Sequence, residues 1–172
     1  MAELTQKERL QPSLLDRLTD NDPERKMESR ETRVISPSRL RDSVRRDLGW
    51  LFNTTHLQVM QHLEDYPLVA RSVLNYGMPD MAGRTVSTMN PAQVEQTIRR
   101  AILDFEPRLV AKTLRVRATV REQQMNHNAM SFDIEAELWA QPLPLRLFLR
   151  TAVDLEDGSI EIRDMGSSSG GT

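Results

Sequence analysis

Residues 90–120 read NPAQVEQTIRRAILDFEPRLVAKTLRVRATV, and the spacing of the apolar side chains changes within this stretch. In its first half Asn90 is a helix cap and Pro91 takes the first helical position. Apolar residues then recur with helical spacing: Val94, Ile98, Ala101, Ile102 and Phe105. Pro107 biases Glu106 away from helical angles and ends the helix. From TLRV onward apolar and polar residues alternate, so the stretch predicts a helix followed by a strand.

The next run, SFDIEAELW, alternates in the same way and is joined to the first strand by a turn near QQMNHN. We therefore expect the two runs to pair antiparallel. A pairing centred near Asn126 keeps both apolar faces on one side and sets two cross-strand ion pairs: Arg117 with Glu135, and Arg115 with Glu137. The arginines are then half of a charge ladder rather than a stripe that binds phosphates.

A second hairpin is predicted after the segment Gln141-Pro142-Leu143-Pro144, which we expect to break the sheet. It lies in LRLFLRTAVDLEDGSIEIRD and has Asp157-Gly158 as its tight turn. In this register Leu155 and Val153 face Ile160 and Ile162.

Upstream of residue 90 the sequence predicts helices. Ser36 can cap a helix that begins at Pro37 and whose apolar residues recur with helical spacing: Leu40, Val44, Leu48, Leu51 and Phe52. A short helix from Pro67 to Tyr76 is expected to end at Gly77, with a loop around Pro79 and Gly83. Residues 34–165 are thus predicted to form a single α+β domain, in which N-terminal helices precede an antiparallel sheet of two hairpins.

The ends of the chain read as tails. Residues 1–33 are mostly polar and are predicted to be flexible, and residues 166–172 to be disordered. One island, PSLLDRL (12–18), has a capping pair in Ser13 and Asp16 and three leucines on one face: Leu14, Leu15 and Leu18. A helix this short orders only when it docks, either on its own domain or on a partner. We assign the three leucines to partner binding.

Composition argues against several classes of function. The formal charge of -2 does not favour nucleic acid, and the absence of cysteine removes thiolate metal sites and cysteine nucleophiles. His56, His62 and His127 lack metal-ligand spacing, and no glycine-rich phosphate loop is present. No apolar run approaches the roughly 18 residues of a membrane span. We therefore expect a soluble, cytoplasmic protein with no cofactor, metal, nucleic acid or small-molecule substrate and no direct insertion into a membrane.

The motif Glu106-Pro107-Arg108 stands at the junction of helix and strand and has two interpretations. In the first the proline only stops the helix, and Arg108 interacts with the last carbonyls or with Glu106. In the second the rigid proline projects two opposite charges in fixed directions, which suits a specific contact with a partner protein.

Five motifs together resemble the TssE family, the baseplate wedge proteins of the bacterial type VI secretion system. They are PSLLDRL, RDLGWLFNT, YPLVARSVLNYGMPD, FEPRL and LRTAVDLEDG, and they span Pro12 to Gly158. TssE proteins are related to a baseplate wedge protein of contractile-tail phages. The resemblance implies an α+β body that resembles the strand-exchanging domain of sheath subunits.

What the resemblance implies for function is a structural, non-enzymatic protein between baseplate and contractile sheath. It would template sheath assembly and bind other wedge proteins and sheath subunits, in a cytoplasmic complex docked at the inner membrane. The family's E-P-R motif, matched by Glu106, Pro107 and Arg108, is associated with contacts inside the wedge. The alternative is a lysozyme-like glycan hydrolase, for which Glu106 beside Arg108 is a poor proton donor.

Overall fold

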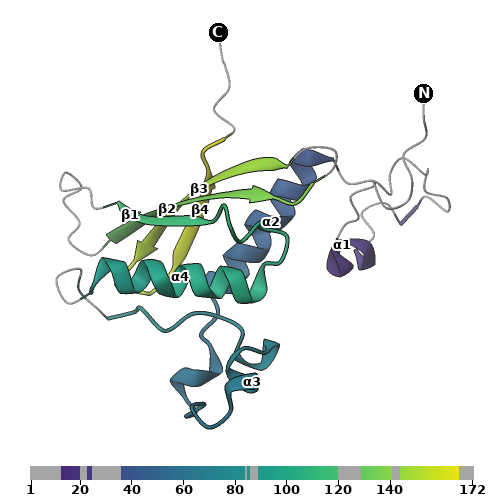
Figure 1. Cartoon of the computed structure of the whole chain (residues 1–172). Helices are drawn as coiled ribbons and strands as arrows, with labels where there is room; N and C mark the ends of the chain where they lie inside the picture. The colour runs from purple at the N-terminus through teal and green to yellow at the C-terminus, as the bar shows by residue number, and fades with distance from the viewer. Residues whose placement is uncertain are drawn as a thin grey trace.

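A four-stranded antiparallel sheet organises the molecule, with its strands in the order β1-β2-β3-β4. The structure is a computed structural model that describes residues 13–19, 23–24, 36–83, 85, 89–119, 129–140 and 144–166. Helices cover one face of the sheet, and a projection hangs below the second long helix (Figure 1). The predicted α+β class is confirmed. Most of the predicted tails, residues 1–33 and 166–172, lies outside the described residues.

The elements follow one another along the chain as helices first and strands second. They are α1 (Leu14–Leu18), α2 (Pro37–Phe52), a 3-10 turn (Leu57–Val59), α3 (Pro67–Ala70), a second 3-10 turn (Val73–Asn75), α4 (Pro91–Phe105), β1 (Arg115–Thr119), β2 (Ala129–Leu138), β3 (Leu145–Asp154) and β4 (Ile160–Asp164).

Both long helices begin where the sequence predicts, and α4 also ends at the predicted place before Pro107. The Ser36 side chain accepts a hydrogen bond from the Arg39 N–H, the Asn90 side chain accepts one from the Ala92 N–H, and a proline opens each helix. The predicted helix from Pro67 to Tyr76 is instead split into α3 and a 3-10 turn, since the Ser72 hydroxyl accepts from the Leu74 N–H and caps a new turn.

The prediction that residues 141–144 break the sheet is wrong, because the strands before and after them belong to the same sheet. β2 and β3 pair along their whole length, from Ala129 opposite Asp154 to Leu138 opposite Leu145. Pro144 directly precedes β3, outside the paired residues, so it removes no hydrogen bond from the ladder. Residues 141–143, and the predicted turn at 123–128, lie outside the described residues.

Both predicted hairpin registers are displaced by two residues. In the first hairpin Arg115 lies opposite Glu135 and Arg117 opposite Asp133. This register leaves the Glu137 N–H to donate to the Thr113 hydroxyl at 2.9 Å. A shift of two keeps every side chain on its predicted face, which is why alternation alone does not reveal it.

In the second hairpin Val153 lies opposite Ile160, and Ile162 opposite Thr151. The predicted turn at Asp157-Gly158 is longer than two residues, because the Gly158 N–H donates to the Asp154 C=O at 2.9 Å. Gly158 has a φ of +77°, the left-handed conformation that glycine favours. The longer turn carries Leu155 into the core, where it is buried.

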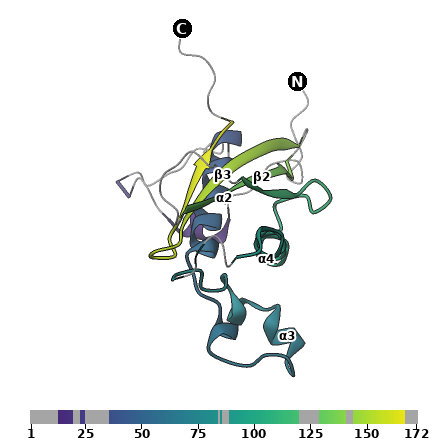
Figure 2. The same cartoon turned by 90° about the vertical axis from the view of Figure 1, so that its left-hand side faces the viewer.

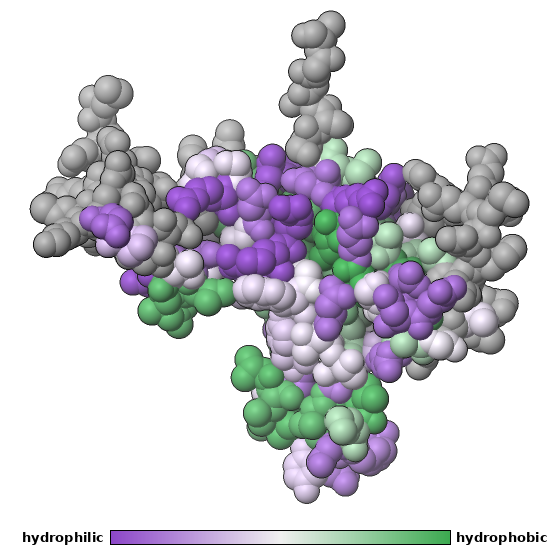
Figure 3. Space-filling model, turned by 180° about the vertical axis from the view of Figure 1, so that it is seen from behind, coloured by the Kyte–Doolittle hydropathy of each residue, from purple (hydrophilic) through white to green (hydrophobic). Residues whose placement is uncertain are grey.

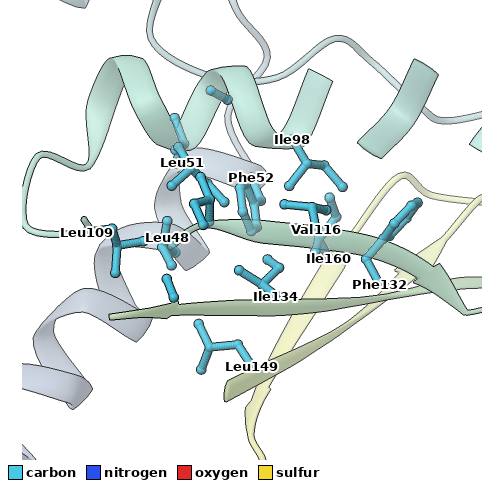
Figure 4. Packing of buried hydrophobic residues seen from close by; sticks show 14 of the residues in the cluster. Leu48, Leu51, Phe52, Ile98, Leu109, Val116, Phe132, Ile134, Leu149 and Ile160 are labelled. Atoms are coloured by element: carbon cyan, nitrogen blue, oxygen red, sulfur yellow. The ribbon is translucent and has the colours of Figure 1, made fainter. Parts of the chain in front are cut away.

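The core lies between the sheet and the two long helices (Figure 4). α2 contributes Leu48 and Leu51, α4 contributes Ile98, and β2 presents Phe132 and Ile134 from alternate positions. α4, seen end-on in Figure 2, lies on the same side of the sheet as α2. The opposite face of the sheet carries charged side chains, among them Arg150 of β3 with its Nε 2.6 Å from a carboxylate oxygen of Asp133 on β2. Among the described helices, none is long and apolar enough to span a bilayer.

Candidate partner-binding site

The E-P-R motif folds into a closed ion pair just after α4 ends. Glu106 is 4% exposed, and one of its carboxylate oxygens accepts from Arg108 Nε at 2.6 Å and from the Arg108 backbone N–H at 3.2 Å. Arg108 Nη2 contacts the other oxygen, so the guanidinium holds the carboxylate with two parallel contacts. Pro107 lies exposed between them. This confirms the predicted interaction of Arg108 with Glu106.

Two further elements hold Arg108 in place. From α2, Asp47 Oδ2 accepts from Arg108 Nη2 at 2.6 Å, and the Ser43 hydroxyl lies 3.3 Å from Nη1. From the end of β2, the Trp139 N–H donates to the Arg108 C=O at 2.8 Å. Burial opposes the charge of the Arg108 guanidinium, but Glu106 and then Asp47 outweigh it and raise its pKa. Arg108 is therefore a permanent cation that joins α4, α2 and the sheet.

A row of alternating charges leads from this ion pair to α1. Asp47 Oδ1 accepts from Arg46 Nε at 2.9 Å, and Arg46 Nη1 lies 2.5 Å from Asp16 Oδ1. The Arg46 guanidinium also covers the Trp50 ring, 5.0 Å from its centroid. We call the residues Glu106, Arg108, Asp47, Arg46 and Asp16 the charge row. It connects the E-P-R motif to the leucine segment, which lies about 90 positions earlier in the sequence.

The predicted leucine segment is the helix α1, and it docks through its polar side. The Ser13 hydroxyl accepts from the Asp16 N–H and lies 2.6 Å from Asp16 Oδ2. The hydrogen bond from Arg46, opposed by burial and supported by Ser13, lowers the pKa of the Asp16 carboxyl. Leu14 and Leu18 remain 70% and 74% exposed, and Leu15 is exposed as well. The segment thus touches its own domain through charges and directs its leucines away from it.

A hollow in the surface lies between the start of α1 and the E-P-R motif. Its volume is about 380 Å³, and Ser13, the residue that caps α1, lines it together with the E-P-R motif. The remaining lining side chains come from α2, the end of α4 and the loop between them: Asp47, Leu48, Leu51, Tyr76 and Phe105. The rings of Tyr76 and Phe105 meet edge to face, 5.2 Å apart. The structure therefore brings both sequence-predicted site elements to the border of one hollow.

Asp47 and Arg46 are the site residues that the sequence pattern did not indicate. Both belong to the face of α2 that reads as solvated, since arginines and aspartates alternate on it. One signal was available: Ser43 and Asp47 are four residues apart, and each is next to a residue of the apolar stripe. Within the described residues no group of three or more histidine, aspartate or glutamate side chains is arranged to hold a metal ion.

The chain was compared with known protein families, curated proteins and solved structures, and one family model matches it. A family model described as baseplate wedge protein gp25 matches residues 38–143, which is more than half of the chain. The chain belongs to this family. The resemblance to baseplate wedge proteins that the five motifs predict is thereby confirmed. No curated protein and no solved structure matches the chain.

The matched range of this wedge protein starts just inside α2 and ends after β2. It contains the E-P-R motif and its partners Ser43, Asp47 and Trp139. Helix α1 and the β3–β4 hairpin lie outside it. The matched range therefore covers the residues around Arg108 and does not reach α1, and it assigns a role to neither element.

Proposed function

We propose that this wedge protein is a structural component of a type VI secretion baseplate, which links the wedge to the contractile sheath and templates sheath assembly. Its partners are other baseplate wedge proteins and sheath subunits, in a cytoplasmic complex docked at the inner membrane. Family membership supports the baseplate role. The five TssE-like motifs support the type VI context, and an open strand edge, described below, supports the link to the sheath.

Wedge binding uses the surface around the hollow. Pro107 is exposed and lines the hollow together with Ser13, and the three leucines that follow Ser13 in the helical segment are exposed and available to a partner. Glu106 is buried, so its part is to fix Arg108 and the exposed proline rather than to meet the partner itself. An apolar side chain from another wedge protein would enter between Phe105 and α1, where the lining is largely apolar.

The link to the sheath uses the outer edge of β4, and this edge is the observation that carries the proposal. The Asp154 N–H donates to the Ser159 C=O and the Met165 N–H donates to the Phe148 C=O, both at 2.9 Å. Hydrogen-bonded pairs alternate along antiparallel strands, so Ile162 and Asp164 direct their N–H and C=O groups outward. In the described part of the chain nothing pairs with them. Such an edge readily accepts an added strand.

Side chains already occupy backbone groups at one end of β4 and on the opposite edge strand β1. The Asn53 carboxamide donates to the Ile160 C=O at 2.9 Å and accepts from the Ile160 N–H at 2.8 Å, as a neighbouring strand would. On the opposite edge Glu95 of α4 accepts from the Ala118 N–H of β1 at 2.6 Å. A sheath strand would therefore be added at β4 and not at β1.

Two substitutions at one position test strand addition. Asp164→Pro removes an outward N–H but no hydrogen bond between β3 and β4, and proline is tolerated on edge strands. Asp164→Ala loses the same side chain but keeps the N–H. In cells that lack the native gene and carry a fluorescent sheath subunit, we expect sheath tubes with Asp164→Ala and none with Asp164→Pro, at equal protein levels. Normal tubes with Asp164→Pro would refute strand addition at this edge.

The alternative function, glycan hydrolysis, needs a carboxylic acid that gives its proton to the glycosidic oxygen. Both oxygens of Glu106 are occupied by Arg108, which leaves this carboxyl group unavailable for that step. Purified protein incubated with peptidoglycan is expected to release no reducing sugar, whereas a lysozyme control does. Release that is lost in Glu106→Gln would establish the enzyme instead.

A further inference from the structure

The loop between Thr54 and Met78 carries an unusual number of exposed apolar side chains. Met60, Leu68 and Val73 are 86%, 87% and 80% exposed, and further large apolar residues are also exposed: Val59, Tyr66 and Leu74. In Figure 3 the green surface of the lower projection corresponds to this loop. Contiguous exposed apolar surface on a soluble protein marks a contact site more often than single exposed residues do.

Hydrogen bonds close this 54–78 loop, so its shape does not depend on those apolar side chains. The His56 N–H donates to the Met78 C=O at 3.0 Å, and the Met78 N–H donates to the Thr54 C=O at 2.7 Å. Inside the loop the buried Asn75 side chain accepts from the Gln58 N–H and donates to the Ala70 C=O, both at 2.9 Å. The buried Asn75 thus holds the loop together by polar contacts, while several of its large apolar side chains lie on the surface.

The close approach at the neck of the loop requires glycine. Gly77 has a φ of +126°, and a Cβ atom there would lie 2.2 Å from the Thr54 carbonyl oxygen. No other residue fits this junction without moving the backbone. The apolar side chains are thus presented by a loop whose neck is fixed by the backbone itself.

The 54–78 loop is also tied to the site around the E-P-R motif. Arg71 Nη2 lies 3.2 Å from Asp104, two residues before Glu106. Tyr76 packs on Phe105, and its hydroxyl lies 3.3 Å from the Asp47 C=O. Tyr76 belongs to the loop and also lines the hollow, so the 54–78 loop borders the hollow at this residue.

The charges of the loop define the chemistry of its partner. Glu64 and Asp65 are exposed beside Tyr66, and Glu64 has His62 as its neighbour at 3.1 Å. Arg71, the one arginine of the loop, is engaged by Asp104. The apolar surface is thus bordered by negative charge, which a groove lined with apolar side chains and bordered by lysine or arginine would complement.

We propose that the 54–78 loop is a second docking element, which inserts its apolar side chains into an apolar groove with a basic border on a neighbouring wedge protein. The proposal rests on the wedge role proposed above. It adds a contact that neither the E-P-R motif nor the leucines of α1 provide.

Methionine oxidation tests whether the loop is covered. Met60 in the loop and Met165 after β4, both exposed, are compared in the isolated protein and in a purified wedge without sheath. We expect both to oxidise in the isolated protein and Met60 alone to be protected in the wedge. Met60 oxidation at an equal rate in both samples would overturn the proposal. Protection of Met60 in the isolated protein would also overturn it. Protection that does not depend on protein concentration would mean that the chain covers its own loop, and protection that rises with concentration would mean self-association.

Substitutions in the loop test whether the contact contributes to binding. Leu68→Ser with Val73→Ser removes two exposed side chains and is expected to leave the melting temperature unchanged. Its affinity for the remaining wedge complex should fall roughly tenfold or more, as for central interface residues. Phe148→Ser, on the outer sheet face, is the matched control and should bind normally.

The charge border is tested by Glu64→Lys with Asp65→Lys. We expect weaker wedge binding than native, with the difference shrinking as salt concentration rises. Normal affinity of both loop variants would refute the docking element while leaving the wedge role intact. Failure of the native chain itself to enter the wedge would overturn the proposed function and this inference together.

Discussion

The E-P-R motif and the leucine segment are both predicted to bind partners, but the fold places them in opposite ways. Glu106 is buried and its oxygens are occupied by Arg108, whereas the leucines of α1 lie exposed on a helix that is held by its polar side. Glu106 supports the surface from a buried position, whereas the leucines of α1 are part of the surface itself. In the proposed function the buried Glu106 would therefore act without touching the partner, because it fixes Arg108.

The largest expected effect on stability comes from breaking the ion pair between Arg108 and the buried Glu106. Arg108→Ala leaves the buried Glu106 carboxylate without its cation. Losing one partner of a buried pair costs about 3–5 kcal/mol, and we expect about 2–3 kcal/mol here because the Arg108 side chain is still 24% exposed. Urea unfolding of native protein and variant measures the difference.

Two controls sharpen that measurement. Arg108→Lys keeps the charge but loses the fork, so its cost should lie between those of native and Arg108→Ala. Pro107→Ala changes an exposed side chain and is expected to cost under about 1 kcal/mol. An unfolding free energy of Arg108→Ala within about 0.5 kcal/mol of native would mean that the ion pair is not an internal support.

The second prediction concerns the exposed leucines of α1. Replacing Leu14, Leu15 and Leu18 together by alanine removes exposed side chains, so the unfolding free energy should stay within about 0.5 kcal/mol of native. Binding to the wedge should weaken roughly tenfold, or about 1.4 kcal/mol. Calorimetry and a binding titration separate the two effects. A large loss of stability would show that the leucines pack on their own domain.

The third prediction contrasts the buried ion pair with an exposed one. Arg150 and Asp133 are as close as Arg108 and Glu106, but both lie on the open face of the sheet. Arg150→Glu should therefore destabilise the protein much less than Arg108→Ala does. Adding Asp133→Arg should restore much of the loss. No coupling in this double-mutant cycle would mean that the pair makes no contribution across the strands.

The smallest expected effect concerns the link between the two elements. The pKa of Asp16 is lowered in the folded protein, so docking of α1 is supported above its ordinary value of 3.8 and lost as the pH falls through the lower folded value. Asp16→Asn should remove this pH dependence and leave global unfolding unchanged.

Trp50 fluorescence reports on this link, because Arg46 lies between the Trp50 ring and Asp16. A Trp139→Phe background leaves Trp50 as the one tryptophan. We expect its emission to change below a pH of about 4 in this protein and not in the Asp16→Asn variant. An identical acid response in both would show that Asp16 does not hold α1.

The sequence predicted those parts of the fold that depend on neighbouring residues. Ser36 and Asn90 cap the long helices because each cap side chain and the backbone N–H that donates to it are within three positions of each other. The faces of all four strands are predicted for the same reason, since alternation is a local pattern. The registers were missed because alternation does not record the contacts that set them. In the first hairpin this is the distant pair Thr113 and Glu137, and in the second it is the turn bond from the Gly158 N–H to the Asp154 C=O.

In the candidate site, too, local features were predicted and contacts between distant segments were missed. Pro107 as a helix stop and Arg108 beside Glu106 are local features and were predicted. Asp47 and Arg46 were missed, because an alternating row of charges on a helix is the usual appearance of a solvated face. The placement of α1 depends on Arg46, which lies 30 positions from Asp16, and no pattern within either segment indicates that contact.

The carboxamide of Asn53 has a consequence for how a machine could be built on this protein. Because it already occupies both backbone groups of Ile160, a strand that adds to β4 meets a fixed end point and cannot slide past it. Sliding by one residue would displace an attached subunit by about 3.4 Å. A single side chain would thus fix the register of an added strand, and with it the position of the subunit that the strand belongs to.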